Sequence, residues 1–152
     1  MRLALDTNVM AYAEGVGDGP RCRHAAAWIA RLPGAAVLVP AQTLGELARV
    51  LHIKERLSAD RIRSTVVSWA DSFAVADSTA SAFRSALDLT VDHGVPMWDA
   101  LILAVAAEHR CRFLLSEDFQ AGFTWGGVTV VNPFESQVPP LLKPWAPQPM
   151  PT

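Results

Sequence analysis

The 152-residue chain has few of the residues that define several common classes of protein. Its two cysteines, Cys22 and Cys111, lie far apart and form neither a CxxC pair nor a Cys/His ligand pattern. We therefore expect neither a disulfide framework nor a zinc site, and we interpret both cysteines as small buried apolar residues. Lysine occurs only at Lys54 and Lys143, and the net charge is −2 with a pI near 6.0. Without an overall positive charge, a phosphate polymer would have to be attracted by local patches or by metal ions.

Long apolar segments are also missing. No apolar run reaches the roughly 18 to 20 residues that a membrane span needs, and Met1 leads directly into a short apolar segment without a signal-peptide pattern. From this we expect no membrane association and a cytoplasmic location. The chain is nevertheless 51% hydrophobic and only 18% charged, a composition that at this length predicts one folded domain with a full core.

Short apolar segments alternate with amphipathic ones along most of the chain. The predicted strands are residues 2–5, 36–39, 73–76, 112–115 and 128–131, and the predicted helices are 25–32, 42–55, 58–71, 77–93 and 98–109. The expected helix-capping residues are Gln42 or Thr43, then Ser58, then Asp77 or Ser78, with Gly94 ending the fourth helix. Alternating strands and helices predict an α/β fold with a mainly parallel sheet between two helical layers.

The C-terminal segment has a different composition. Seven of the twenty residues from 133 to 152 are proline, so this segment cannot continue the sheet and is expected to be extended, disordered or only partly ordered. We therefore divide the chain into a domain at 1–134 and a proline-rich tail at 135–152. Leu141, Leu142 and Trp145 could dock the tail on the domain, on a second subunit or on another protein.

Two of the predicted strands end abruptly in acidic and hydroxyl residues. The first strand runs into Asp6, Thr7 and Asn8, and the segment FLLSEDF (113–119) ends in Ser116, Glu117 and Asp118. Ligands bind parallel sheets at the carboxyl ends of the strands, which makes both ends candidate sites. The alternatives are structural, because Asp6 can cap a helix and a polar turn commonly follows a strand.

Two further carboxylates lie on predicted helices. Asp99 shares the i, i+3, i+4, i+7 face of Ile102, Leu103 and Ala106, and a carboxylate on an apolar face costs several kcal/mol unless it is paired or coordinated. Asp99 could instead stabilise the helix N-terminus. Glu46 lies at the edge of an apolar stripe, where an ion pair with Arg49 is the structural alternative.

Together these acids are best explained by a cation. Two carboxylates at strand ends and two near helix starts can converge on one crevice, where they repel one another unless a metal neutralises them. Oxygen ligands without His or Cys favour Mg²⁺ or Mn²⁺ over zinc. Such a centre can activate water and stabilise charge on a phosphoryl group, with one or two ions.

These motifs resemble the PIN-domain family, and in particular its bacterial VapC-type toxin ribonucleases. The resemblance rests on LDTNV, TLGELARVL, MWDALILAVA and LLSEDF, followed by GVTVVNPF, in the family's order across residues 2–134. It implies a three-layer α/β/α fold and Mg²⁺- or Mn²⁺-dependent endoribonuclease activity, with hydrolysis by a metal-activated water. It also implies a cognate antitoxin and a homodimer.

The resemblance also assigns roles to residues. The motifs place Asp6, Glu46, Asp99 and Asp118 in an acidic catalytic and metal-binding quartet. Thr7 and Ser116 would supply hydroxyl groups beside the metal or phosphate. Glu117 is expected to point outward or to support the site from outside it.

RNA binding requires positive charge, and basic residues are densest on and just after the helix that contains Glu46. The candidates are Arg49, Lys54 and Arg56, together with His52, Arg61 and Arg63. A solvated helical hairpin would carry the same charges. Apolar residues of this hairpin, namely Leu47, Val50, Leu51, Leu57 and Ile62, are where the family resemblance would place the antitoxin.

Other classes fit the sequence less well. Asp6-Thr7-Asn8 lacks the second acid of a haloacid-dehalogenase DxD pair, no lysine fits a receiver domain, and no glycine fingerprint follows the first strand. The remaining rival is a PIN-like binding or scaffold module with weak or no nuclease activity. The four retained acids argue against it, because a scaffold could replace Asp99 with an apolar residue.

Overall fold

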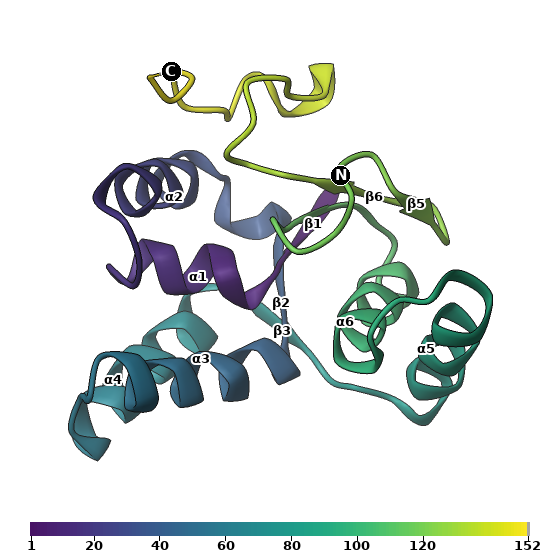
Figure 1. The fold of residues 1–152 in the computed structure, drawn as a ribbon, viewed down its shortest axis with the longest axis horizontal. Helices are drawn as coiled ribbons and strands as arrows, with labels where there is room; N and C mark the ends of the chain where they lie inside the picture. Colours follow the sequence, from purple (N-terminus) through teal and green to yellow (C-terminus); the bar gives the residue numbers. More distant parts are fainter. Residues whose placement is uncertain (152) are drawn as a thin grey trace.

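A six-stranded, mainly parallel sheet forms the centre of the computed structural model, which describes residues 1–151 (Figure 1). The strands are β1 (Arg2–Leu5), β2 (Val37–Pro40), β3 (Ala74–Ala76), β4 (Cys111–Leu115), β5 (Thr124–Trp125) and β6 (Val128–Val131), in the order β3-β2-β1-β4-β6-β5. Neighbouring strands are parallel except β5 and β6, which form an antiparallel hairpin. The five predicted strands are confirmed, whereas the two-residue β5 was not predicted.

Helices cover both faces of this sheet, which confirms the three-layer α/β/α architecture. The helices are α1 (Thr7–Ala13), α2 (Gly19–Arg31), α3 (Ala41–Lys54), α4 (Ala59–Ser72), α5 (Ala80–His93) and α6 (Met97–Glu108). Figure 1 shows α1 to α4 on one side of the strands and α5 with α6 on the other. None of the helices in residues 1–151 is long and apolar enough to cross a membrane.

Each face of the sheet has its own apolar core, because successive strand residues point to opposite faces. Leu3 and Leu5 pack with α1 to α4, whereas Ala4 between them packs with α5 and α6. Every residue from Ala100 to Ala106 is buried, so α6 has apolar contacts all around and not only on one face. The start of α6 is thereby held firmly against the sheet.

Two of the expected helix caps are wrong. Helix α3 begins at Ala41 directly after Pro40, and the hydroxyl of Thr43 donates to the Pro40 carbonyl at 2.7 Å instead of capping the helix. Gln42 does not cap it either. Helix α5 is capped by Thr79, whose Oγ1 accepts a hydrogen bond from the Ala82 amide at 3.0 Å. Asp77 and Ser78 therefore precede the cap by one or two residues. The expected cap of α4 at Ser58 and the end of α5 at Gly94 are confirmed.

The proline-rich tail packs on the domain near α2 (Figure 1). It contains a short 3-10 helix, η2 (Pro140–Leu142), whose Leu142 is completely buried in the core beneath α1 to α4. The Arg31 guanidinium donates from Nε to the Trp145 carbonyl at 3.2 Å, and Trp28 donates from Nε1 to the Pro133 carbonyl at 3.0 Å. The tail is irregular, as its prolines indicate, but residues 135–151 are neither a strand nor a free extension.

Both cysteines are free thiols, as expected from their spacing. Cys111 is buried in β4, where burial raises its pKa to about 11. Cys22 on α2 is only half-buried, so the interpretation of both as buried apolar residues holds for Cys111 alone.

Candidate metal centre at the carboxyl edge of the sheet

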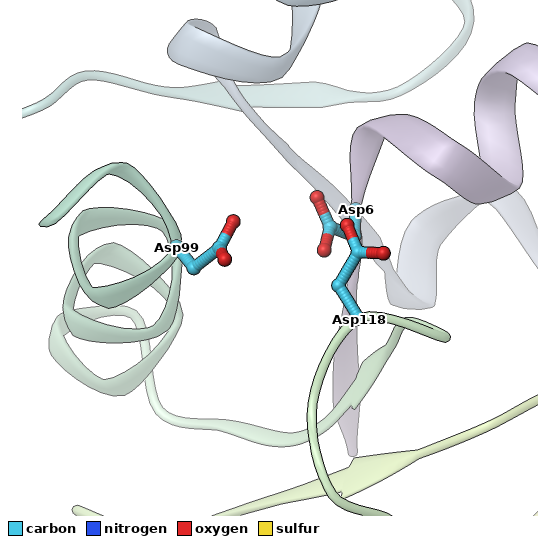
Figure 2. A group of neighbouring side chains, drawn as sticks. All are labelled: Asp6, Asp99 and Asp118. Atoms are coloured by element: carbon cyan, nitrogen blue, oxygen red, sulfur yellow. The ribbon is translucent and has the colours of Figure 1, made fainter. Parts of the chain in front are cut away.

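Three aspartates meet between β1 and β4, where the strand order of the sheet reverses. Strands β1 and β4 are neighbours, and β2 continues the sheet on one side while β6 continues it on the other, which creates a crevice at their carboxyl ends. Asp6 follows β1 and Asp118 follows β4, while Asp99 comes from the first turn of α6. Figure 2 shows the three carboxylates pointing toward one another. One carboxylate oxygen from each lies within 4.8 Å of the others.

The carboxylate of Asp6 is fixed on both of its oxygens. Oδ1 accepts a hydrogen bond from the Thr7 amide at 2.7 Å, so Asp6 is the N-cap of α1. Oδ2 accepts a hydrogen bond from the Ser116 hydroxyl at 2.6 Å. The two interpretations of Asp6 are therefore compatible, because one side chain both caps the helix and faces the acid cluster.

Ser116 connects the ends of β1 and β4. Besides donating to Asp6, its Oγ accepts from the Asp118 amide at 3.1 Å and from Nδ2 of Asn8 at 3.3 Å. The Asn8 side chain also accepts a hydrogen bond from the Glu117 amide at 3.4 Å. Asn8 was not predicted as a site residue, although its place directly after Asp6 and Thr7 was the available signal.

The electrostatics of the cluster are those of carboxylates without a cationic neighbour. Burial raises the pKa of Asp6 to about 7; hydrogen bonds from Ser116 and Thr7 oppose this rise, and the charges of Asp118 and Asp99 add to it. Burial also raises the pKa of Asp99, with further contributions from Asp118 and Glu46. Within residues 1–151, no Lys or Arg forms an ion pair with Asp6, Asp99 or Asp118.

The donor set fits a hard divalent cation. All three groups offer carboxylate oxygens, two of them have raised pKa values, and no nitrogen or sulfur ligand lies within the group. Oxygen ligands of this kind suit Mg²⁺ or Mn²⁺. A cation bound here would relieve the repulsion among the three charges.

Glu46 lies beside the three aspartates and not within their group. Its Oε2 accepts from the Thr7 hydroxyl at 2.5 Å, and its Oε1 accepts from Nε2 of Gln42 at 2.6 Å. The structure thus brings three of the four predicted acids into one group, with Glu46 attached to its edge through Thr7. The alternative ion pair between Glu46 and Arg49 does not form.

Glu117 points away from the three aspartates. Its Oε1 accepts from the Tyr12 hydroxyl at 2.8 Å, and its Oε2 lies 3.6 Å from Nε of Arg21. Burial raises the pKa of Tyr12 to about 12, and the interaction with Glu117 adds to the rise. These contacts hold the loop that carries Asp118. Tyr12 and Arg21 were not predicted, since nothing in their sequence positions reveals a contact more than ninety residues away.

A cleft of about 590 Å³ opens beside the acid cluster, between α1, α3 and the loop after β4. Glu46, Glu117 and Asp118 line its acidic end, and Arg49 and Lys54 of α3 also line it. Arg56 is exposed beyond α3 and does not line this cleft.

The apolar residues predicted to receive a partner are divided between core and surface. Leu47 and Leu51 are buried beneath α3 and cannot contact another protein. Val50, Leu57 and Ile62 are only partly buried. A partner on this hairpin is therefore limited to the second group, with the more exposed Ile53 and Val67 beside it.

Comparison with known proteins agrees with this architecture. Residues 3–121 match the family model described as the PIN domain, and the chain belongs to this family. Among solved structures, the Mycobacterium tuberculosis toxin VapC20, described as cleaving the sarcin-ricin loop, is 21% identical with a TM-score of 0.64; the match covers 76% of this chain and 91% of that one. A toxin-antitoxin complex from Klebsiella pneumoniae is 20% identical with a TM-score of 0.63, over 85% and 96% of the two chains.

A third structure, described as FitAcB from Neisseria gonorrhoeae, is 21% identical with a TM-score of 0.59, over 86% of this chain and 97% of that one. At these identities the structures establish a shared fold. No sequence among curated proteins matches the chain significantly.

Proposed function

We propose that the protein is a metal-dependent endoribonuclease and the toxin of a toxin-antitoxin pair, acting on RNA in the cytoplasm. The observation that carries this proposal is the meeting of Asp6, Asp99 and Asp118 at the carboxyl edge of the sheet without a cationic partner among residues 1–151. Membership of the PIN-domain family and the toxins among its structural neighbours support it.

In this proposal, Asp6, Asp99 and Asp118 hold Mg²⁺ or Mn²⁺, with Glu46 as an additional acid at the edge of the site. When bound, the metal would lower the pKa of a water molecule and stabilise charge on the phosphoryl group. Ser116 fixes the orientation of Asp6 and the backbone at Asp118 through two of its hydrogen bonds. Thr7 holds Glu46, whose oxygens can orient the attacking water on the cleft side.

Positive charge for the RNA backbone comes from the C-terminal part of α3. Arg49 and Lys54 line the same cleft as Asp118, and the exposed Arg56 lies directly beyond them. These residues would contact phosphates flanking the scissile bond. The negative net charge of the chain makes this local patch and the bound metal the principal sources of attraction.

The antitoxin is proposed to cover the exposed side of the α3–α4 hairpin. Its candidate contacts are the partly buried Val50, Leu57 and Ile62 and the exposed Ile53. Because Val50 also lines the cleft, antitoxin and RNA would compete for part of the same surface. The structural neighbour from Klebsiella pneumoniae is a toxin-antitoxin complex, which supports a partner of this kind.

We further propose a homodimer through the outer face of α5. Leu87 and Val91 are 52% and 83% exposed, and Phe83 precedes them on the same face with its ring against Trp98. Arg84 and Asp88 are exposed and lie about one turn apart on this helix. An antiparallel second copy would therefore pair unlike charges while it covers the apolar stripe.

The dimer is tested by measuring molar mass with light scattering. Leu87→Glu is expected to convert a dimer to a monomer, whereas Val67→Glu, at an exposed position on α4, leaves the mass unchanged. A wild-type monomer at micromolar concentration, or a Leu87→Glu dimer, would contradict this interface.

The nuclease is tested by incubating mixed transfer and ribosomal RNA with purified protein and Mg²⁺ or Mn²⁺. Cleavage is expected in the wild type, with loss in EDTA and a decrease of at least about a hundredfold in Asp99→Asn. Asp71→Asn, at an exposed position of α4, serves as the charge-matched control and should cut as the wild type does. Intact RNA in every lane, with folding verified, would favour the binding-module alternative.

A further inference from the structure

The cleft beside the acid cluster continues well beyond the acids. Away from Asp118, its surface includes Ala11 and Tyr12 of α1, Val16 in the following loop, and Val50 of α3. Ala11 and Val16 are almost fully buried and belong to the apolar core, so this part of the cleft has an apolar floor. An apolar floor has no use in binding a metal ion or a phosphate group.

The size of the cleft also exceeds what the metal centre needs. Its volume of about 590 Å³ lies within the range of pockets that hold organic ligands. Asp99, which belongs to the acid group, does not line it. The cleft is therefore a separate compartment that shares only its acidic end with the proposed metal centre.

Positive groups lie along the α3 side of this compartment. Arg49 and Lys54 both line it, with Glu55 next to Lys54, and within residues 1–151 neither Arg49 nor Lys54 forms an ion pair. An uncharged, flat and apolar group attached to a phosphate would satisfy both the floor and these cations. A nucleotide has this chemistry, since its base is a planar ring and its backbone is anionic.

The geometry points to a nucleobase subsite in this cleft: we propose that the base of one unpaired nucleotide next to the scissile phosphate inserts between Tyr12 and Val50. Arg49 and Lys54 contact the phosphates of that nucleotide. The inference rests on the proposed nuclease and adds a requirement for an unstacked base, which RNA offers in single strands, loops and bulges.

Tyr12 is a suitable wall because three contacts fix its ring. Its hydroxyl donates to Glu117, and its ring packs edge-on against Phe134 with centroids 5.0 Å apart. Gly17, with φ of 118°, lies so close that a Cβ there would be 2.5 Å from Cε1 of Tyr12. A wall that is already immobile loses little conformational entropy when a ligand binds.

The experiment measures binding of single-stranded RNA hexamers to protein carrying Asp99→Asn, so that cleavage does not interfere. Each hexamer contains one 2-aminopurine, and a second set contains one abasic position in its place. We expect one position at which 2-aminopurine fluorescence changes on binding and at which the abasic substitution weakens affinity at least about tenfold. Equal affinities for all the abasic hexamers would overturn the subsite, and this result needs no further protein variant.

Val50→Phe provides the complementary test by filling the cleft from the protein side. It is expected to weaken binding of the intact hexamer at least about tenfold and to remove the effect of the abasic position. Val75→Phe, at an exposed position of β3 that does not line the cleft, is the matched control and should bind as the parent protein does. Unchanged RNA binding by a folded Val50→Phe protein would overturn the proposal. Val50 would then be assigned only to contact with a protein partner.

The outcome separates the subsite from the nuclease. If the wild type cleaves RNA but its affinity does not depend on any base, the subsite is wrong and the nuclease stands. If binding depends on one base but the wild type does not cleave RNA, the nuclease is wrong and the subsite stands.

Discussion

The carboxylate of Asp6 is only 2% exposed, and it is the most buried of the three acids in the site. Its neighbours at Ser116 and Thr7 donate hydrogen bonds that fix its orientation, yet burial still keeps its pKa near 7. Burying an isolated carboxylate is unfavourable in free energy. A bound cation would offset this desolvation, so the geometry suits a metal ligand.

This pKa predicts a pH dependence of the metal-free protein. Since the folded pKa of Asp6 lies above its usual value of 3.8, the folded state binds the proton more tightly than the unfolded chain does. The resulting stability is complete below about pH 4 and is lost as pH rises through about 7. In EDTA, the free energy of unfolding should therefore fall by roughly 2 kcal/mol between pH 5.5 and 8.

Urea unfolding followed by tryptophan fluorescence measures this slope. Asp6→Asn keeps a side chain that can cap α1 but cannot titrate, so the variant should lose most of the dependence and be more stable than the wild type at pH 8. Identical slopes for the two proteins would show that Asp6 is not the titrating group.

At the scale of the elements, Gly94 shows how a single position ends a helix. Its φ is 68° in the left-handed region, and its amide donates to the Thr90 carbonyl at 3.0 Å to close α5. Gly45 differs, because it lies inside α3, where an added Cβ would meet nothing within 4 Å.

The two glycines therefore predict opposite effects of alanine. Gly94→Ala should lower the free energy of unfolding by about 1 kcal/mol, since a side chain is strained at this φ. Gly45→Ala should raise it by about 0.5 to 1 kcal/mol, because alanine is the better helix former and the space is open. Equilibrium unfolding of both variants checks the signs, and a stabilising Gly94→Ala would contradict the described C-cap.

The sequence predicted the presence of strands and helices better than it predicted the residues at which they begin and end. Strands β1, β2, β4 and β6 are largely buried apolar runs, and β3 is a short apolar run with only Ala76 buried, whereas β5 has two residues and depends on pairing with β6. Asp77, Ser78 and Thr79 can all cap a helix; in the structure Thr79 is the cap, and its hydroxyl also donates to Glu108 of α6 at 2.7 Å. At α3 the strand extends through Pro40, so the helix starts before either expected cap.

At the scale of the whole molecule, the tail is part of the domain's packing. Leu142 is 0% exposed within the core that also contains Trp28 and Leu3, whereas the adjacent Leu141 is 54% exposed. Leu142→Ala should therefore cost about 2 to 5 kcal/mol of stability, and Leu141→Ala less than about 1 kcal/mol. Thermal unfolding of both variants tests this difference, and equal melting temperatures would mean that the tail does not pack as described.

The site also becomes complete only at this scale. Asp6, Asp99 and Asp118 could be predicted because strand ends and helix starts converge at the crevice of a parallel sheet. The places of Glu46, Tyr12 and Arg21 could not be predicted, since they depend on side-chain contacts between segments far apart in the sequence. The sequence therefore revealed the acids that meet at this edge but not the residues that hold them.

The most direct test of the metal centre is calorimetric titration of Mn²⁺ into the purified protein at pH 8, where Asp6 is mostly ionised in the absence of metal. The wild type should show saturable binding, and Asp99→Asn should bind at least about tenfold more weakly, while the exposed Asp71→Asn on α4 binds as the wild type does. Absence of binding to the wild type, or equal affinity in Asp99→Asn, would contradict the account that Asp6, Asp99 and Asp118 form one cation site.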